Sequence, residues 1–105
     1  MSAAVKQLVD TAISSHFIAV FSKSYCPYCR KAKALLNELS LPEGKSIKVF
    51  ELDELDNGAD IQNYLAEKTG QRTVPNIFIQ GKHVGGSDDL SKAKSSGALA
   101  KLIQI

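Results

Sequence analysis

The sequence predicts an α/β fold in which a central four-stranded mixed β-sheet is flanked by helices on both faces. Short apolar runs typical of strands alternate with longer segments whose apolar residues recur at helical spacing, in the order α-β-α-β-α-β-β-α. Such alternation favours parallel strands covered by helices on both sides. The last two strands lie too close in the chain for a parallel crossover, so we expect them to pair antiparallel.

The first two elements are a helix from Ala3 to about Ser15 and a strand over Phe17–Phe21. The apolar positions that indicate the helix are Ala4, Val5, Leu8, Val9, Ala12 and Ile13. The strand is a continuous run of aromatic, branched and small apolar residues bounded by Ser15 and Ser22, as expected of a strand that is buried on both faces.

The second helix follows a cysteine-containing segment and closes at Pro42 and Gly44, which do not continue a helix. Its apolar positions are Ala32, Leu35, Leu36 and Leu39. Residues Ile47–Leu52 alternate apolar and polar side chains and predict a strand. A third helix ends at Gly70, a residue type that suits a left-handed C-terminal cap. The apolar positions of this helix are Ile61, Tyr64 and Leu65.

The C-terminal part contains two short strands and one or two helices. Ile77–Ile79 predicts a strand, Gln80–Lys82 a turn, and His83–Val84 a second strand. We expect Ser87 to be the N-cap of the helix that follows. Apolar positions in these helices are Leu90 and Ala93, then Leu99, Leu102 and Ile103.

Length and charge exclude several classes of protein. The 105 residues suit a single domain, 1–105. Thirteen basic and eleven acidic residues give a net charge of +2, too small an excess for a dedicated nucleic-acid binder. No apolar run approaches the roughly 20 residues of a membrane span, and no secretory signal or transit peptide is evident. We therefore expect a cytoplasmic monomer that binds neither nucleic acid nor membrane.

The two cysteines, Cys26 and Cys29, lie between a predicted strand and a predicted helix. If Cys26 is at or next to the N-cap, Pro27 takes the first helical position, where its missing N–H costs nothing. The Cys26 sulfur then faces the unpaired N–H groups and the positive end of the helix dipole, which favour the thiolate. Cys29 lies one turn on, on the same side, and we expect it to be more buried.

Basic residues around the motif add positive charge, namely Lys23, Arg30 and Lys31. Two other interpretations of the cysteines are half of a zinc site and a pair of inert thiols. A structural zinc site needs four ligands, and the other good candidates, His16 and His83, stand in no recognisable spacing with the cysteines. A Cys-x-x-Cys sequence in a β-α context indicates redox chemistry.

An acidic stretch follows the second predicted strand. Its members are Glu51, Asp53, Glu54, Asp56 and Asp60. The stretch lacks the ligand spacing and the distal Glu of an EF-hand calcium loop. We therefore interpret it as a solvated loop and the start of a helix.

Three motifs together resemble those of the glutaredoxin family. Cys26-Pro27-Tyr28-Cys29 resembles the dithiol active site, Thr73-Val74-Pro75 resembles the cis-proline loop, and Gly85-Gly86-Ser87-Asp88-Asp89 resembles the glutathione-binding turn. Their order and spacing match over nearly the whole chain. The resemblance implies a thioredoxin-like fold and glutathione-dependent thiol–disulfide exchange, with glutathione as co-substrate and no metal or flavin.

The resemblance also implies a set of glutathione-binding residues. Lys23 would meet one carboxylate, and Gln62 and Arg72 would hold the glycine carboxylate. Beside Thr73, the Val74 backbone would pair with the cysteine moiety of glutathione, next to a cis bond at Pro75.

In the second half of this implied site, Gly85 and Gly86 would allow unusual backbone angles and close approach of the ligand. The helix opened by Ser87 and Asp88 would present N–H groups to the γ-glutamyl carboxylate. Asp88 would accept the γ-glutamyl amine, and Tyr28 would flank the mixed disulfide.

In the implied mechanism Cys26 is the nucleophile and Cys29 the resolving thiol, and together they form the redox-active disulfide. Partners would be glutathione and glutathionylated or disulfide-containing proteins. One alternative is a dimer that binds an iron–sulfur cluster through glutathione, as some relatives do, but these usually carry Gly or Ser at the position of Pro27, or Ser in place of the second cysteine. Another is a thioredoxin-like reductase fed by a flavoprotein, which the absence of Trp disfavours.

Overall fold

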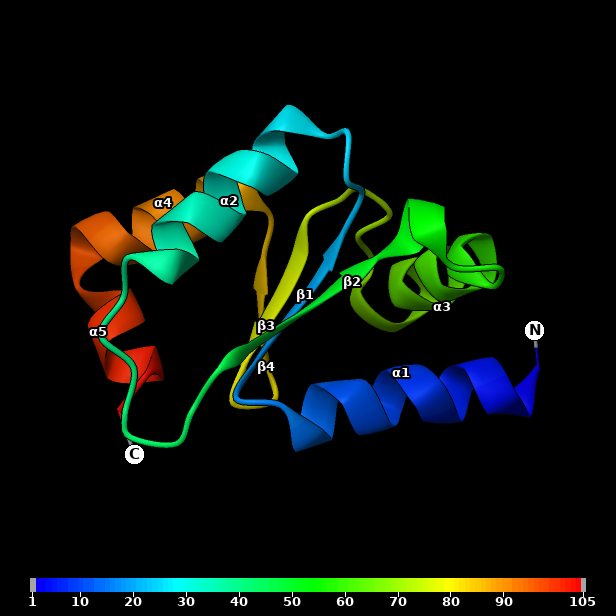
Figure 1. Cartoon of the computed structure of the whole chain (residues 1–105), viewed down its shortest axis with the longest axis horizontal. Coiled ribbons are helices and arrows are strands. Elements are labelled where there is room, and N and C mark those ends of the chain that lie inside the picture. The colour runs from blue at the N-terminus through cyan, green and yellow to red at the C-terminus, as the bar shows by residue number, and fades with distance from the viewer. Residues whose placement is uncertain (1, 105) are drawn as a thin grey trace.

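A computed structural model describes residues 2–104 and contains a single sheet with helices on both sides (Figure 1). The elements in chain order are α1 (Ala3–Ser15), β1 (Ile18–Ser22), α2 (Pro27–Asn37), β2 (Ile47–Glu51), the 3-10 helix η1 (Leu52–Glu54), α3 (Gly58–Thr69), β3 (Asn76–Ile79), β4 (Lys82–Gly85), α4 (Ser87–Ser96) and α5 (Ala98–Leu102). The predicted order is confirmed, with α5 as the last short helix. In the described part, no helix is long and apolar enough to cross a membrane.

The sheet has four strands in the order β2-β1-β3-β4 and is mixed, as predicted. β1 runs parallel to β2, with Ser22 opposite Glu51 at their ends. β1 is antiparallel to β3, and β3 is antiparallel to β4. The alternation of strands and helices favoured parallel pairing, but only β1 and β2 pair in this way. The two central strands, β1 and β3, are buried along their whole length.

The two faces of the sheet carry two separate groups of apolar side chains. Ala19 and Phe21 of β1 pack with residues of α1 and α3 on one face. Ile18 and Val20 pack with residues of α2, α4 and α5 on the other (Figure 1). Because successive side chains of a strand point to opposite faces, one buried strand serves both groups. The ends of β1 and β2 thus lie under the start of α2.

Several predicted boundaries are corrected. β1 begins at Ile18 rather than Phe17 and includes Ser22. β2 ends at Glu51, because Leu52 turns into η1 and is buried against α3 residues. α2 ends at Asn37, so Leu39 packs on the core from outside the helix.

Candidate active site

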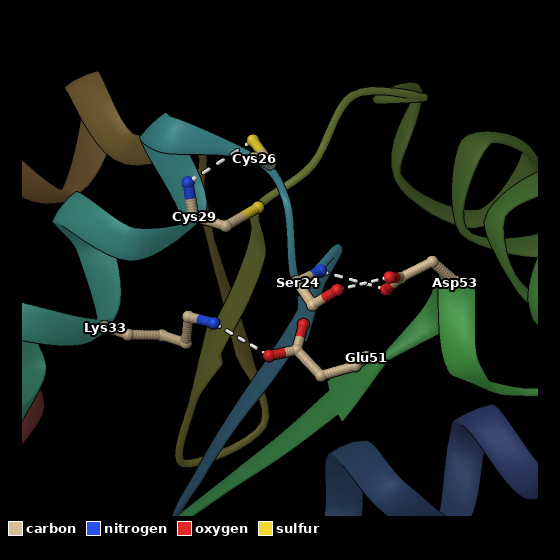
Figure 2. A network of polar contacts seen from close by, with 6 residues as sticks. All are labelled: Ser24, Cys26, Cys29, Lys33, Glu51 and Asp53. Carbon is tan, nitrogen blue, oxygen red and sulfur yellow. Dashed lines mark hydrogen bonds and ion pairs between the residues drawn. The ribbon is translucent and has the colours of Figure 1, made fainter.

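The first cysteine begins α2. Cys26 is the N-cap residue, Pro27 follows within the first turn, and the Cys29 N–H donates to the Cys26 Sγ at 3.4 Å (Figure 2). This is the predicted arrangement: a sulfur occupies the position in which a Ser or Asp oxygen usually caps a helix. It favours a negative charge on the sulfur.

The two thiols lie in different environments. Burial opposes ionisation of Cys26, but hydrogen bonds from the Cys29 thiol and from the N–H groups of Cys29 and Tyr28 outweigh it and lower its pKa. Cys29 is fully buried, and its burial, together with the neighbouring Cys26, raises its pKa. Cys26 is therefore the more readily ionised thiol, and Cys29 is held as a protonated thiol.

Lys33 is the basic residue among the main causes of the lowered Cys26 pKa. Its charge helps to lower the pKa of Cys26, a role that the sequence analysis gave to Lys23, Arg30 and Lys31. Lys33 lies one turn beyond Cys29, and its Nζ pairs with the Glu51 Oε2 at 2.7 Å (Figure 2). Arg30 and Lys31 are exposed to solvent.

Two residues of the acidic stretch also reach the motif, so its interpretation as a merely solvated segment is corrected. Glu51 pairs with Lys33, and the Asp53 carboxylate accepts hydrogen bonds from the Ser24 N–H at 2.9 Å and from the Ser24 hydroxyl (Figure 2). Asp53 thereby fixes the segment that precedes Cys26. The parallel pairing of β1 and β2 places their C-terminal ends together. A prediction of this pairing could have indicated that Glu51 and Asp53 lie near the cysteine motif.

A cavity of about 420 Å³ lies beside the cysteines. Its lining residues are Tyr28, Gln71, Thr73, Val74, Pro75, Gly86, Ser87, Asp88 and Asp89. The Val74–Pro75 peptide bond is cis, as the resemblance implied. The Cys26 thiol lies 3.9 Å from the Val74 carbonyl oxygen, so this thiol stands at the edge of the cavity. A cavity of about 560 Å³ elsewhere, beside α1, contains no cysteine.

Gln71 is a site residue that the sequence analysis missed. Its Nε2 donates to the carbonyl oxygens of Thr73 at 3.1 Å and of Pro75 at 3.0 Å. One side chain therefore binds the backbone on both sides of Val74. Pattern analysis gave no signal for it, because a Gln beside a Gly and an Arg is typical of an ordinary loop.

The start of α4 closes the far side of the cavity. Two expectations are corrected here: that Ser87 is the N-cap, and that Gly85 and Gly86 both have unusual backbone angles. The N-cap is Gly86 rather than Ser87, because the Gly86 carbonyl accepts the first helical bond, from Leu90, at 3.0 Å. Gly86 has an ordinary φ of −99°, whereas Gly85 has a φ of +120°. The Asp89 carboxylate accepts a hydrogen bond from the Gly86 N–H at 2.9 Å.

Three predicted binding residues lie outside the lining of this cavity. The Gln62 Nε2 donates to the Arg72 carbonyl at 2.9 Å, and the Arg72 Nη1 donates to the Asn63 Oδ1 at 2.5 Å. Both side chains thus join the loop to α3. Lys23 is half-buried near Asp53, whose pKa is lowered by its hydrogen bonds to Ser24 and, more weakly, by the Lys23 charge.

The site combines a helix-capping cysteine thiol of lowered pKa, a buried second thiol, and an adjacent cavity bounded by a cis-proline loop and a helix start. These features define a thiol–disulfide oxidoreductase of thioredoxin-like fold. Among residues 2–104, no cluster of three or more His, Cys, Asp or Glu side chains is arranged to hold a metal ion.

The glutaredoxin family model matches residues 18–84. Glutaredoxin-1 of Rhizophagus irregularis is 54% identical over 99 residues, which cover 94% of each chain. Glutaredoxin-C8 of Oryza sativa is 48% identical over 104 residues, covering 99% of this chain and 75% of the relative. The chain belongs to the glutaredoxin family and is a thiol oxidoreductase.

Solved structures agree with this assignment. The holo form of glutaredoxin C1 from Populus tremula x tremuloides has a TM-score of 0.86 and 44% identity, covering 98% of this chain and 97% of that one. A buckwheat glutaredoxin–glutathione complex has a TM-score of 0.86 and 34% identity, covering 98% and 94%.

Proposed function

We propose that this chain, acting as a single domain, is a dithiol glutaredoxin that reduces protein–glutathione mixed disulfides and protein disulfides with electrons from glutathione. The observation that carries the proposal is the contrast between the two thiols beside one cavity. Cys26 is accessible and has a lowered pKa, whereas Cys29 is buried and has a raised pKa. The buckwheat relative that was solved as a complex with glutathione supports the choice of ligand.

In the monothiol route, the Cys26 thiolate attacks the glutathione sulfur of a mixed disulfide, and the protein thiol leaves with the electron pair. A second glutathione thiolate then attacks the glutathione sulfur joined to Cys26, releasing glutathione disulfide and free enzyme. In the dithiol route, the Cys26 thiolate attacks a protein disulfide, forms a mixed disulfide with one substrate sulfur and releases the other as a thiolate. Cys29 then attacks the Cys26 sulfur and displaces the remaining substrate thiol, and two glutathione molecules reduce the resulting Cys26–Cys29 disulfide. Reduction potentials of glutaredoxins, about −200 to −230 mV, lie near that of the glutathione pool, so both directions are accessible.

Glutathione is proposed to occupy the cavity of about 420 Å³. The Val74 backbone pairs with its cysteine moiety, and Tyr28, which is 63% exposed, flanks the disulfide. The N–H groups at the start of α4, at Ser87 and Asp88, bind the γ-glutamyl carboxylate. The Asp88 carboxylate accepts the γ-glutamyl amine.

Lys23, Gln62 and Arg72 are proposed to meet the glycine end of the ligand at the rim. Two positions support this contact with the ligand. Lys23 lies just before the cysteine motif, and Gln62 and Arg72 join the cis-proline loop to α3. Gln62 also binds the Arg72 backbone, so both residues sit on a fixed segment.

The test is glutathione-coupled reduction of a glutathionylated peptide by wild type, Cys26→Ser and Cys29→Ser. We expect Cys26→Ser to be inactive and Cys29→Ser to remain active, because the monothiol route needs only Cys26. Turnover by Cys26→Ser would contradict the assignment of the nucleophile. If wild type shows no glutathione-dependent turnover, the enzymatic proposal is wrong. Visible absorbance after anaerobic reconstitution with iron and sulfide would then favour the cluster-binding alternative.

A further inference from the structure

Ser22 and Glu51 end the two parallel strands β1 and β2 as direct register partners. Paired residues of neighbouring strands point to the same face of a sheet, and the chains lie about 5 Å apart. This face is the one whose apolar residues pack beneath α2. From α2, Cys29 and Lys33 are one turn apart and so share a side of the helix. The four residues therefore form one group between α2 and the strand ends.

Two polar atoms in this group are buried without an ordinary hydrogen-bond partner. Ser22 is fully buried, and its hydroxyl has no such partner among the described residues. The Glu51 Oε2 binds Lys33 at 2.7 Å, while its Oε1 is buried and equally unpartnered. Figure 2 shows this second oxygen directed toward the end of β1. Unpaired buried polar atoms are unfavourable and rare, so two of them on adjacent strands mark this group as a candidate for a functional contact.

Cys29 lies against the same group. Its burial raises its pKa, and the Ser22 hydroxyl, which faces the Cys29 thiol, acts in the opposite direction. A buried thiol is a poor nucleophile until it loses its proton. An acceptor must lie within hydrogen-bond reach, directly or through one intermediate group. The Ser22 hydroxyl faces Cys29, and Glu51 is the register partner of Ser22 on the same face of the sheet. No hydrogen bond joins Ser22 to Glu51 in the resting structure, and catalytic hydrogen bonds often tighten only in the reacting complex.

We propose that Glu51, acting through the Ser22 hydroxyl, receives the proton that Cys29 loses when it attacks the Cys26 mixed disulfide. The inference rests on the dithiol route proposed above. As the Cys29 proton moves to the Ser22 Oγ, the Ser22 proton moves to the Glu51 Oε1. The Cys29 electron pair forms a bond to the Cys26 sulfur, and the bond from Cys26 to the substrate sulfur breaks. The substrate leaves as a thiolate, the two cysteines are oxidised, and Glu51 later returns its proton to water.

Lys33 holds the carboxylate in place for this step. Its pairing with the Oε2 leaves the Oε1 as the free acceptor on the side of Ser22. Glu51 is thus a positioning and proton-accepting residue that acts through Ser22, and it does not itself contact the substrate.

The two thiols can be timed separately with 2,2′-dithiodipyridine, which releases a coloured thiopyridone at each displacement. Attack by Cys26 on the reagent gives the first phase, and attack by Cys29 on the Cys26 adduct gives the second. At pH 7 we expect Glu51→Gln to slow the second phase about tenfold or more. At about pH 10, where solvent hydroxide removes the Cys29 proton, the rates of variant and wild type should converge.

Glu54→Gln is the matched control, because Glu54 is exposed and its substitution makes the same change in charge nearby. Ser22→Ala should slow the second phase as Glu51→Gln does, and the double variant should be no slower than either single variant. An unchanged second phase in Glu51→Gln, or the same slowing at every pH, would overturn the proposal. If wild type itself releases only one thiopyridone, the dithiol route fails instead.

Discussion

The Cys29 N–H donates to the Cys26 Sγ across 3.4 Å, so the residue that is proposed to resolve the mixed disulfide also stabilises the thiolate that is proposed to form it. The Cys29 thiol adds a second hydrogen bond to the Cys26 sulfur. Each donation to Cys26 lowers the pKa of that thiol, and the proximity of Cys26 raises the pKa of Cys29. The spacing of the motif therefore contributes to the difference between the two thiols, together with the burial of Cys29.

Removal of the Cys29 thiol should weaken the Cys26 thiolate. Cys29→Ala loses the side-chain donor to Cys26, whereas Cys29→Ser keeps a hydroxyl there. A hydrogen bond of about 0.5–1.5 kcal/mol corresponds to an alkylation rate about three- to tenfold lower for Cys29→Ala at acid pH. Iodoacetamide kinetics over a pH series measure the effect. Equal profiles for the two variants would show that the backbone donors alone set the Cys26 pKa.

Loss of the Lys33 charge should raise the Cys26 pKa. Lys33→Met should slow Cys26 alkylation about two- to threefold below neutral pH, because a partly exposed charge contributes less than about 1 kcal/mol. Lys31→Met is the control, since Lys31 is exposed and is not among the main causes of the lowered Cys26 pKa. The same slowing in both variants would indicate a general charge effect in place of a specific one. The slowing by Lys33→Met should shrink at high salt.

Gln71 should fix the loop that is proposed to bind glutathione. Gln71→Met removes two hydrogen bonds to the backbone around Val74, together about 1–3 kcal/mol, and should raise the KM for glutathione. Gln80→Met is matched to it, because the Gln80 Nε2 also binds two backbone carbonyls, those of Leu102 and Gln104, far from the cavity. Urea unfolding should find both variants less stable, and a raised KM only for Gln71→Met. An unchanged KM would remove Gln71 from the site.

Gly85 should tolerate substitution worse than other glycines with positive φ. At a φ of +120°, an added Cβ would collide with the Asp89 carboxylate that caps α4. We expect Gly85→Ala to cost about 2–4 kcal/mol through backbone strain and the lost cap. Gly97→Ala, at a φ of +87° in open space, should cost about 1–2 kcal/mol. Denaturant unfolding measures both, and equal costs would contradict the collision.

Much of the site was predictable because it depends on local spacing. Cys26, Pro27 and Cys29 stand where a strand gives way to a helix, and that position alone predicts a capped sulfur and a buried second thiol. Boundaries were less predictable. Ser87 looked like an N-cap by residue type, yet the N-cap is Gly86, whose N–H donates to the Asp89 carboxylate. Residue type alone does not decide which of two adjacent residues caps a helix, because the backbone angles at that point decide it.

The sequence by itself determined which segments form helices and strands and which cysteine begins a helix, because these depend on periodicity and on neighbours within a turn or two. Only the tertiary structure decided that β3 runs antiparallel to β1 and that Asp53 meets Ser24 from 29 positions away. It likewise decided that Lys33, which pairs with Glu51, is the lysine whose charge helps to lower the pKa of Cys26. Contacts between distant segments follow from strand order and register, which local patterns do not encode.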